Sequence, residues 1–187
     1  MRSGVPCGAM TVWASPPVVS VVRKEERRVS SIPFRRTQWF FPVAVTLHNF
    51  EEAASMPKWI SVHSSQLPLH PGRGFVWTGL LVVTLAAFAV TALSAREGEE
   101  SPWAYLLFGA ISTMLLNVFI PHLPATLFFG GYTPGVVTAV LINLPLMSIL
   151  LFQAVRDRWV SGRKAIVYAL LVPGAVGGSI AAAFALT

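Results

Sequence analysis

The sequence predicts an all-α fold: a polytopic membrane bundle of about five transmembrane helices, with the N-terminus inside the cell and the C-terminus outside. Only 12% of the 187 residues are charged and 54% are hydrophobic, whereas soluble domains carry about a quarter charged residues. Four stretches, residues 75–94, 103–120, 132–155 and 165–186, approach the ~20 apolar residues that cross a bilayer. The basic residues lie at the ends of apolar stretches rather than along one soluble face, which argues against binding to nucleic acid.

Residues 1–36 differ from the rest of the chain, because basic residues and prolines are interspersed there among few apolar side chains. Such a composition is typical of disorder. We therefore expect a disordered basic cytoplasmic tail over residues 1–36, or a start codon assigned too early, followed by a transmembrane helical domain over residues 37–187. Cys7 is the single cysteine, which excludes an internal disulfide and a thiolate metal cluster.

The first predicted segment begins near Thr37 and has an uninterrupted apolar core from Trp39 to Leu47. This core is only about half a bilayer deep in helical form. The segment spans the membrane only if its helix continues through His48 and two glutamates to Pro57, since the residue before a proline disfavours helix. A full crossing and a half crossing are both compatible with the sequence.

The four apolar stretches given above are segments two to five, and short links separate them. Residues 58–74 form a loop rich in proline and glycine, and residues 122–131 form an uncharged link after segment three. Thr133 is placed to cap segment four, with Pro134 at the first helical position. A basic loop over residues 156–164 precedes segment five.

The charge distribution predicts the orientation. With the N-terminus inside, twelve of the 14 lysines and arginines lie on the cytoplasmic side and only Lys58 and Arg73 lie outside, as the positive-inside rule describes. The end of segment one, the end of segment three and the start of segment four then meet at the outer side of the cell (cytoplasmic) membrane. Polar residues stand at all three places, which predicts one common site.

His48, Glu51 and Glu52 follow directly on the apolar core of segment one. On an ideal helix, Glu51 lies about 60° to one side of His48 and Glu52 about 40° to the other, so the three share a face. Ionisable groups at membrane depth are costly and by default functional, and carboxylates near a helix C-terminus oppose the helix dipole. We therefore expect a metal ion, a proton or a histidinium to compensate them.

Segments three and four supply further polar residues at this level. Asn117 and His122 would lie about 140° apart on an ideal helix, but Pro121 disrupts the last turn, so that His122 can swing inward. Tyr132 stands just outside segment four. Asn143 lies deeper in that segment, as a buried polar group that needs a partner.

A box of five residues, a pair and a turn occur in a fixed order along the chain: His48-Asn49-Phe50-Glu51-Glu52, Asn117-x4-His122 and Tyr132-x-Pro134-Gly135, preceded by Trp39. In these features the chain resembles the HXXEE-domain family of bacterial integral membrane proteins. The resemblance covers Thr37 to the end of segment four and, more loosely, segment five. It implies a membrane helical fold and no established reaction.

The sharpest hypothesis is one divalent metal ion, zinc or iron, bound by His48, Glu52 and His122. Two histidines and one carboxylate with an open position are the pattern of catalytic zinc and non-haem iron sites. The spacing on segment one resembles the inverted zinc-protease motif H-x-x-E-H. The expected reaction is hydrolysis of a lipid-soluble or membrane-embedded substrate, with Glu51 as general base. The supporting residues are Asn117, Tyr132 and Asn143.

Two alternatives are open. The same side chains could form a proton or metal relay in a transporter subunit, although no internal repeat of the transporter type is visible, or they could hold helices together in a non-catalytic membrane protein. His63 and His70, in the outer loop, are candidates for an additional ligand. The lipid bilayer is the expected partner, and the spacing of Gly174 and Gly178 permits an oligomer.

Overall fold

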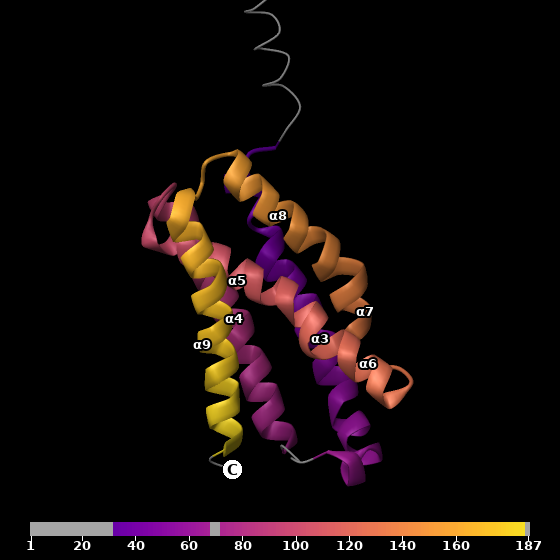
Figure 1. Ribbon diagram of the computed structural model, residues 1–187. Coiled ribbons are helices and arrows are strands. Elements are labelled where there is room, and N and C mark those ends of the chain that lie inside the picture. Colours follow the sequence, from indigo (N-terminus) through magenta and orange to yellow (C-terminus); the bar gives the residue numbers. More distant parts are fainter. Residues whose placement is uncertain (1–31, 68–71, 186–187) are drawn as a thin grey trace, which may run out of the picture. The chain divides into compact units, whose positions relative to one another are not determined.

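The computed structural model describes residues 32–67 and 72–185, and every regular element in these ranges is a helix (Figure 1). The prediction of an all-α fold is therefore confirmed. In chain order the elements are α2 (Phe34–Thr37), α3 (Phe40–Val62), the 3₁₀ turn η1 (Ser64–Gln66), α4 (Arg73–Glu97), α5 (Pro102–Asn117), the π-helical turn η2 (Val118–His122), α6 (Leu123–Phe129), α7 (Val136–Thr138), the π-helical turn η3 (Ala139–Asn143), α8 (Leu144–Arg156) and α9 (Gly162–Ala185).

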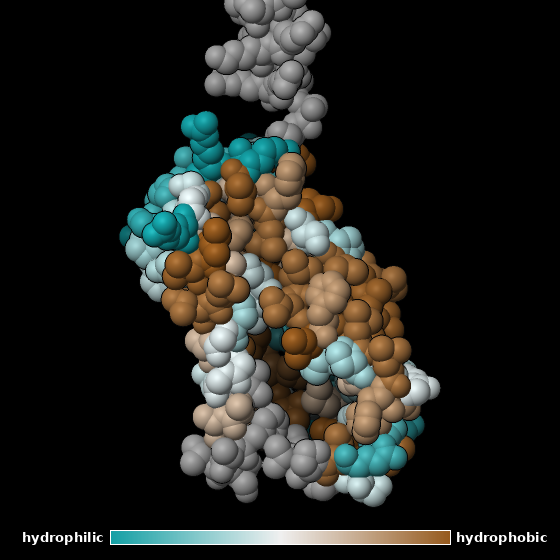
Figure 2. All heavy atoms as spheres, in the orientation of Figure 1, coloured by the Kyte–Doolittle hydropathy of each residue, from teal (hydrophilic) through white to brown (hydrophobic). Residues whose placement is uncertain are grey.

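Three helical stretches are long and apolar enough to cross a membrane: Arg73–Glu97, Pro102–Phe129 and Val136–Arg156. On the face shown in Figure 2, hydrophobic side chains form a band between hydrophilic ends. Leu81 and Leu85 of α4 are each 59% exposed. An extensive apolar surface is unfavourable in water and suits the hydrocarbon core of a bilayer. These helices therefore indicate a membrane protein.

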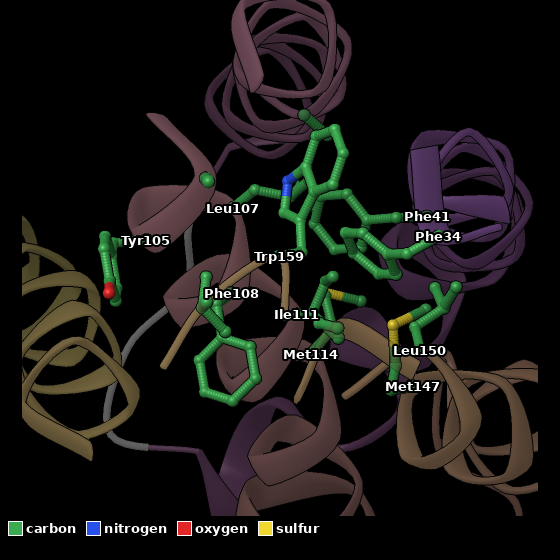
Figure 3. Packing of buried hydrophobic residues seen from close by; sticks show 14 of the residues in the cluster. Phe34, Phe41, Tyr105, Leu107, Phe108, Ile111, Met114, Met147, Leu150 and Trp159 are labelled. Carbon is green, nitrogen blue, oxygen red and sulfur yellow. The ribbon is translucent and has the colours of Figure 1, made fainter. Parts of the chain in front are cut away.

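Helix α5 packs against α4, α8 and α9 (Figure 1). Its Leu107 and Ile111 are completely buried, as are Met147 and Leu150 of α8, and these side chains meet in the hydrophobic cluster of Figure 3. Burying a large aliphatic side chain contributes about 1.5–3 kcal/mol. The cluster thus fixes α5, whose last residue begins the candidate site.

The close approach of α5 and α9 depends on Gly109, because a Cβ there would lie 2.7 Å from the Tyr168 carbonyl oxygen. In contrast, a Cβ added at Gly174 or Gly178 would meet no atom of the described chain within 4 Å. These two glycines therefore do not serve packing within the bundle. An oligomer formed through them stays a prediction.

The domain boundary expected after residue 36 falls inside α2. Phe34 is 1% exposed, and its backbone N–H donates a hydrogen bond to Asp157 Oδ2 at 2.8 Å. The hydroxyl of Thr37 donates to Gln153 Oε1 at 2.6 Å. Helix α2 thus packs at the end of α8 and belongs to the helical domain, which begins at Pro33. Residues 1–31 of the expected tail lie outside the described residues.

The expectation that the first helix stops at Pro57 is wrong, since α3 continues through this proline to Val62. A proline lacks the N–H that would bond to the carbonyl four residues earlier, which here is the carbonyl of Ala53. Trp77 of α4 supplies the missing donor, with its Nε1 at 3.2 Å from the Ala53 oxygen. A contact between two helices thus offsets the local cost of the proline.

The link expected over residues 122–131 is largely helical, because α6 occupies Leu123–Phe129. The chain bends before it, at Ile120, whose φ of −145° and ψ of 109° are not helical. The Ile120–Pro121 peptide bond is cis. Segment three therefore consists of two helices, α5 and α6, joined by the π turn η2.

Segment four begins later than expected. Its first helical residue is Val136 rather than Pro134, because Gly135 has a φ of +83°, a left-handed conformation that interrupts a right-handed helix. Thr133 does not cap the helix with its side chain. Its hydroxyl contacts the Thr126 hydroxyl at 2.7 Å, which ties the turn to α6.

Candidate metal centre

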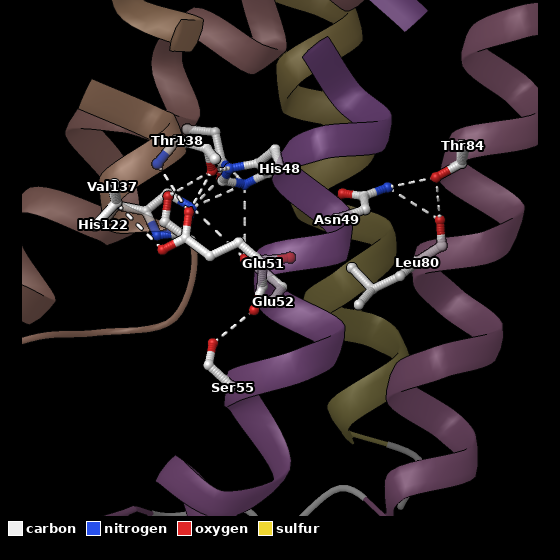
Figure 4. Close-up of polar contacts among 12 residues, drawn as sticks. His48, Asn49, Glu51, Glu52, Ser55, Leu80, Thr84, His122, Val137 and Thr138 are labelled. Carbon is white, nitrogen blue, oxygen red and sulfur yellow. Dashed lines mark hydrogen bonds and ion pairs between the residues drawn. The ribbon is translucent and has the colours of Figure 1, made fainter. Parts of the chain in front are cut away.

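Three side chains from two segments meet in the interior of the bundle (Figure 4). His48 and Glu52 lie one turn apart on α3, with His48 Nε2 at 3.7 Å from Glu52 Oε1. His122, at the end of η2, has its Nε2 at 3.6 Å from the same Glu52 oxygen and at 3.2 Å from His48 Nε2. Both histidines are buried, and the three ligand atoms lie within 4.8 Å of one another. This group could hold a metal ion.

The bend inside η2 explains how His122 reaches the site. An ideal α-helix would separate it from Asn117 by about 140°, but the backbone at Ile120 is not helical and bends the chain between these two residues. As a result, Asn117 Nδ2 lies 3.0 Å from His122 Nε2, and it also lies 3.2 Å from His48 Nε2. The amide thus faces both imidazoles. His122 thus turns inward, through the bend at Ile120 inside η2.

Glu51 lies beside this group and makes different contacts. Its Oε2 accepts hydrogen bonds from the backbone N–H of Thr138 at 2.8 Å and from the Thr138 hydroxyl at 2.6 Å. Its Oε1 lies 2.9 Å from the Tyr132 hydroxyl and accepts the Val137 N–H at 3.3 Å. Free N–H groups in a first helical turn attract a carboxylate. Glu51 therefore binds the start of segment four to α3.

Thr138 connects Glu51 to His48. Since its hydroxyl proton is donated to Glu51, the Thr138 oxygen accepts the hydrogen bond from His48 Nδ1 at 2.9 Å. This contact places the proton of a neutral His48 on Nδ1, so the lone pair of Nε2 faces His122 and Glu52. Ligating histidines are typically oriented in this way by a hydrogen bond to their other nitrogen. Sequence reasoning missed Thr138, although the turn at Pro134-Gly135 signalled that a helix with free N–H groups begins nearby.

Gly135 forms the wall of the group. A Cβ at this position would lie 2.6 Å from His122 Cε1, 2.9 Å from His48 Cε1 and 3.0 Å from Glu52 Cγ. No side chain fits at the first of these distances without displacement of a histidine. Glycine is therefore required at this position for two reasons: its φ is positive, and three side chains pack against it.

The donor set of two imidazole nitrogens and one carboxylate oxygen suits zinc and divalent iron. Comparison with known proteins supports the same region. A family model described as "Protein of unknown function with HXXEE motif" matches residues 39–150. The chain belongs to this family. Uncharacterized protein YrkK of Bacillus subtilis (strain 168) is 31% identical to it over 135 residues, which are 71% of this chain and 84% of that protein. No solved structure gave a significant match.

The HXXEE motif divides its residues between the site and the packing of α3. His48 and Glu52 belong to the candidate metal group, and Glu51 holds segment four. Asn49 points to α4, where its Nδ2 donates to the Leu80 carbonyl at 3.0 Å and to Thr84 Oγ1 at 2.8 Å (Figure 4). Phe50 is 74% exposed. The expectation that His48, Glu51 and Glu52 share one face is confirmed, but only two of them converge on His122.

Two other residues expected in support lie at different depths. Tyr132 is 48% exposed and contacts Glu51 rather than the histidines. Burial raises the pKa of its phenol, Ser55 opposes this effect, and Glu51 raises the pKa further. Asn143, in η3, is completely buried, and its amide has no hydrogen-bond partner in the described part of the chain.

His63, one of the two histidines expected in the loop after segment one, is not part of the group. The ring of His63 stacks on Trp59, with centroids 4.5 Å apart, and its Nδ1 lies 2.9 Å from the Trp59 carbonyl oxygen. His70 lies outside the described residues. Among the described residues, the candidate metal group therefore takes its two histidines from α3 and η2.

Proposed function

We propose that this member of the HXXEE family is a multi-pass protein of the cell membrane and a metal-dependent hydrolase of lipid-soluble or membrane-embedded substrates. Its five spans are α3, α4, α5–α6, α7–α8 and α9, with the N-terminus in the cytoplasm and the metal centre toward the outer side. The observation that carries the proposal is the meeting of His48, Glu52 and His122 in the bundle. The ion is zinc or divalent iron.

The electrostatics of the group support an ion. Nε2 of His48, held as an acceptor by Thr138, lies 3.2 Å from Nε2 of His122, and the Glu52 carboxylate lies within 3.7 Å of both. Acceptor atoms in a low-dielectric interior repel one another unless a cation or shared proton lies between them. A divalent cation at their centre would bind both Nε2 atoms and the Glu52 carboxylate at once.

A bound ion would supply the Lewis acidity that polarises a carbonyl oxygen and acidifies water. The protein positions the ligands: Thr138 orients His48, and Gly135 leaves the room in which the imidazoles meet. Glu51 is the candidate general base, because its Oε1 lies at the exposed edge of the site beside Tyr132. Its Oε2 keeps the hydrogen bond to Thr138, so the same carboxylate would both hold the start of segment four and accept a proton.

The distribution of buried ionisable groups favours an enzyme over a relay. Within the described residues, the buried side chains that are basic or acidic near neutral pH are His48 and His122, and both belong to the same group. A proton or metal path needs further such groups along the bundle. Clustering at one place is the arrangement expected of a bound ion.

The test is elemental analysis of the purified full-length protein beside His48→Ala, His122→Ala and, as matched control, His63→Ala, whose histidine lies outside the group. We expect about one zinc or iron ion per chain in the wild type and the control, and none in the other two variants. A metal-free wild type that is folded would refute the metal centre.

The roles of the two glutamates are tested separately. Glu52→Gln should lose the ion, whereas Glu51→Gln should keep it, because a glutamine oxygen can still accept the Thr138 hydroxyl. Glu51→Gln should also abolish hydrolysis of a long-chain p-nitrophenyl ester in detergent micelles, if such an ester is a substrate. Equal loss of metal from both variants would contradict this division of roles.

A further inference from the structure

A fourth side-chain atom lies among the three candidate ligand atoms. Asn117 Nδ2 is 3.2 Å from His48 Nε2 and 3.0 Å from His122 Nε2, and the two Nε2 atoms are 3.2 Å apart. These three atoms form a nearly equilateral triangle. Glu52 Oε1 lies 3.7 and 3.6 Å from the two histidine corners of the triangle.

Five of the six edges of a tetrahedron drawn through these four atoms have lengths close to those of a coordination tetrahedron. Ligand bonds of about 2.0–2.1 Å to zinc place neighbouring ligand atoms of a tetrahedron about 3.3–3.4 Å apart. The five separations given above lie between 3.0 and 3.7 Å. The carboxamide of Asn117 therefore occupies the position of a ligand, as the two imidazoles and the carboxylate do.

The oxygen of the amide reaches the same position as its nitrogen. A half-turn of the terminal amide exchanges Oδ1 and Nδ2, and an amide oxygen is a suitable ligand for a divalent cation whereas its NH₂ group is not. Asn117 is also the residue directly before η2, and His122 is the last residue of that turn. The bend inside η2 thus brings both side chains of this segment toward α3.

We propose that Asn117 is the fourth protein ligand of the metal centre, through Oδ1. The inference rests on the proposed function, because it assigns a ligand to the same ion. One carboxylate and three neutral ligands leave a divalent ion with a net charge of +1. Water or a substrate oxygen would be a fifth ligand, an expansion of the coordination that zinc sites allow. Asn117 is placed here as a ligand and has no part in proton transfer.

The experiment compares metal affinity, by competition with a chelator, in the full-length wild type and in Asn117→Leu, Asn117→Asp and Asn49→Leu. Asn117→Leu removes the ligand at similar volume and should weaken binding at least tenfold. Asn117→Asp replaces the neutral oxygen by an anionic one and should bind at least as tightly as the wild type. Asn49→Leu is the matched control, because Asn49 is a buried asparagine that bonds to α4 instead, and its affinity should not change.

A second measurement tests the proposal even if Asn117→Leu fails to fold. Cobalt bound to the Asn117→Asp protein should show visible absorption bands shifted from those of the wild type, because a ligand has changed. Wild-type affinity in Asn117→Leu, or an unshifted cobalt spectrum in Asn117→Asp, would overturn the assignment of Asn117 while the other three ligands stand. A wild type that binds no ion would instead refute the proposed function together with this inference.

Discussion

Two buried polar clusters of this protein differ in how their donors and acceptors are matched. In the Gln38 cluster (Gln38, Ser94 and Trp159), Gln38 Nε2 donates to the Arg35 carbonyl at 2.9 Å and its Oε1 accepts the Ser94 hydroxyl at 3.0 Å. Ser94 in turn accepts the Trp159 Nε1–H at 3.1 Å. Each of these donors has an acceptor, as is usual for buried groups.

The candidate metal group (His48, Glu52 and His122) is different, because it gathers side chains that ligate metals. The two Nε2 atoms lie 3.2 Å apart, Glu52 Oε1 lies within 3.7 Å of both, and the Asn117 amide faces the two imidazoles. The Gln38 cluster joins helices through paired donors and acceptors, whereas the two imidazoles and the carboxylate lie close enough to share one cation. The comparison teaches that the chemistry and spacing of the side chains, rather than burial or polarity, separate a candidate site from a structural contact.

The largest effect is expected at Gly135. Gly135→Ala should weaken metal binding at least about 100-fold, more than the 10–100-fold that loss of a supporting group costs, because the new Cβ would displace His122 and His48. Gly130→Ala is the control, since Gly130 also has a positive φ (+65°) but an added Cβ meets no atom within 4 Å. Chelator competition measures both. Equal affinities in the two variants would remove Gly135 from the site.

The next effect concerns the orientation of His48. Thr138→Val keeps the shape of the side chain and removes the hydroxyl that joins His48 Nδ1 to Glu51, so metal affinity should fall about 10–100-fold. Thr138→Ser restores the hydroxyl and should recover most of the affinity. Titration with zinc in detergent solution checks both. A loss of affinity in the serine variant as large as that in the valine variant would mean that the methyl group, rather than the hydroxyl, matters.

Substitution in the Gln38 cluster should have the opposite effect, a loss of stability without a loss of metal. Gln38→Leu leaves the Ser94 hydroxyl without its buried acceptor, which costs about 1–3 kcal/mol of stability, while the metal content stays at the wild-type level. Thermal unfolding and elemental analysis of the same sample give the two quantities. A loss of metal with this substitution would show that the two clusters are coupled, which would break the comparison.

Much of the candidate site could be predicted from the sequence, because His48, Glu51 and Glu52 occur within five residues on one helix. The period of a helix is enough to place such neighbours. The meeting of α3 with η2 was expected only from charge counting. It depends on the non-helical backbone at Ile120, which the pattern of apolar residues does not reveal.

The failed predictions have tertiary causes. Pro57 does not end α3, because a tryptophan from α4 bonds to the carbonyl that the proline leaves free. Thr133 does not cap segment four, because Gly135 takes a left-handed conformation and the helix starts after it. Local rules do not include such contacts.

The smallest effect, at the same end of the bundle as the Gln38 cluster, is a dependence of stability on pH. Asp157 accepts the Phe34 N–H and contacts Arg156 Nε at 2.8 Å. Partial burial raises its pKa, but the hydrogen bonds from Arg156 and Phe34 and the charge of Arg156 outweigh this, so the pKa lies below its ordinary value. Since folding lowers this pKa, the stabilisation is complete above the ordinary value of about 3.9 and is lost as pH falls through the folded value.

Asp157→Asn should therefore lower the stability of the fold by less than about 1 kcal/mol between about pH 5 and 8, the size expected for a partly exposed ion pair. The difference from the wild type should disappear in stronger acid, where Asp157 itself is protonated. Thermal unfolding of both proteins at several pH values measures it. A difference that grows as the pH falls would have the wrong sign. Asp157 lies at the end of α8 and not beside His48. Loss of metal with Asp157→Asn would therefore contradict the separation of the Gln38 cluster from the candidate metal group.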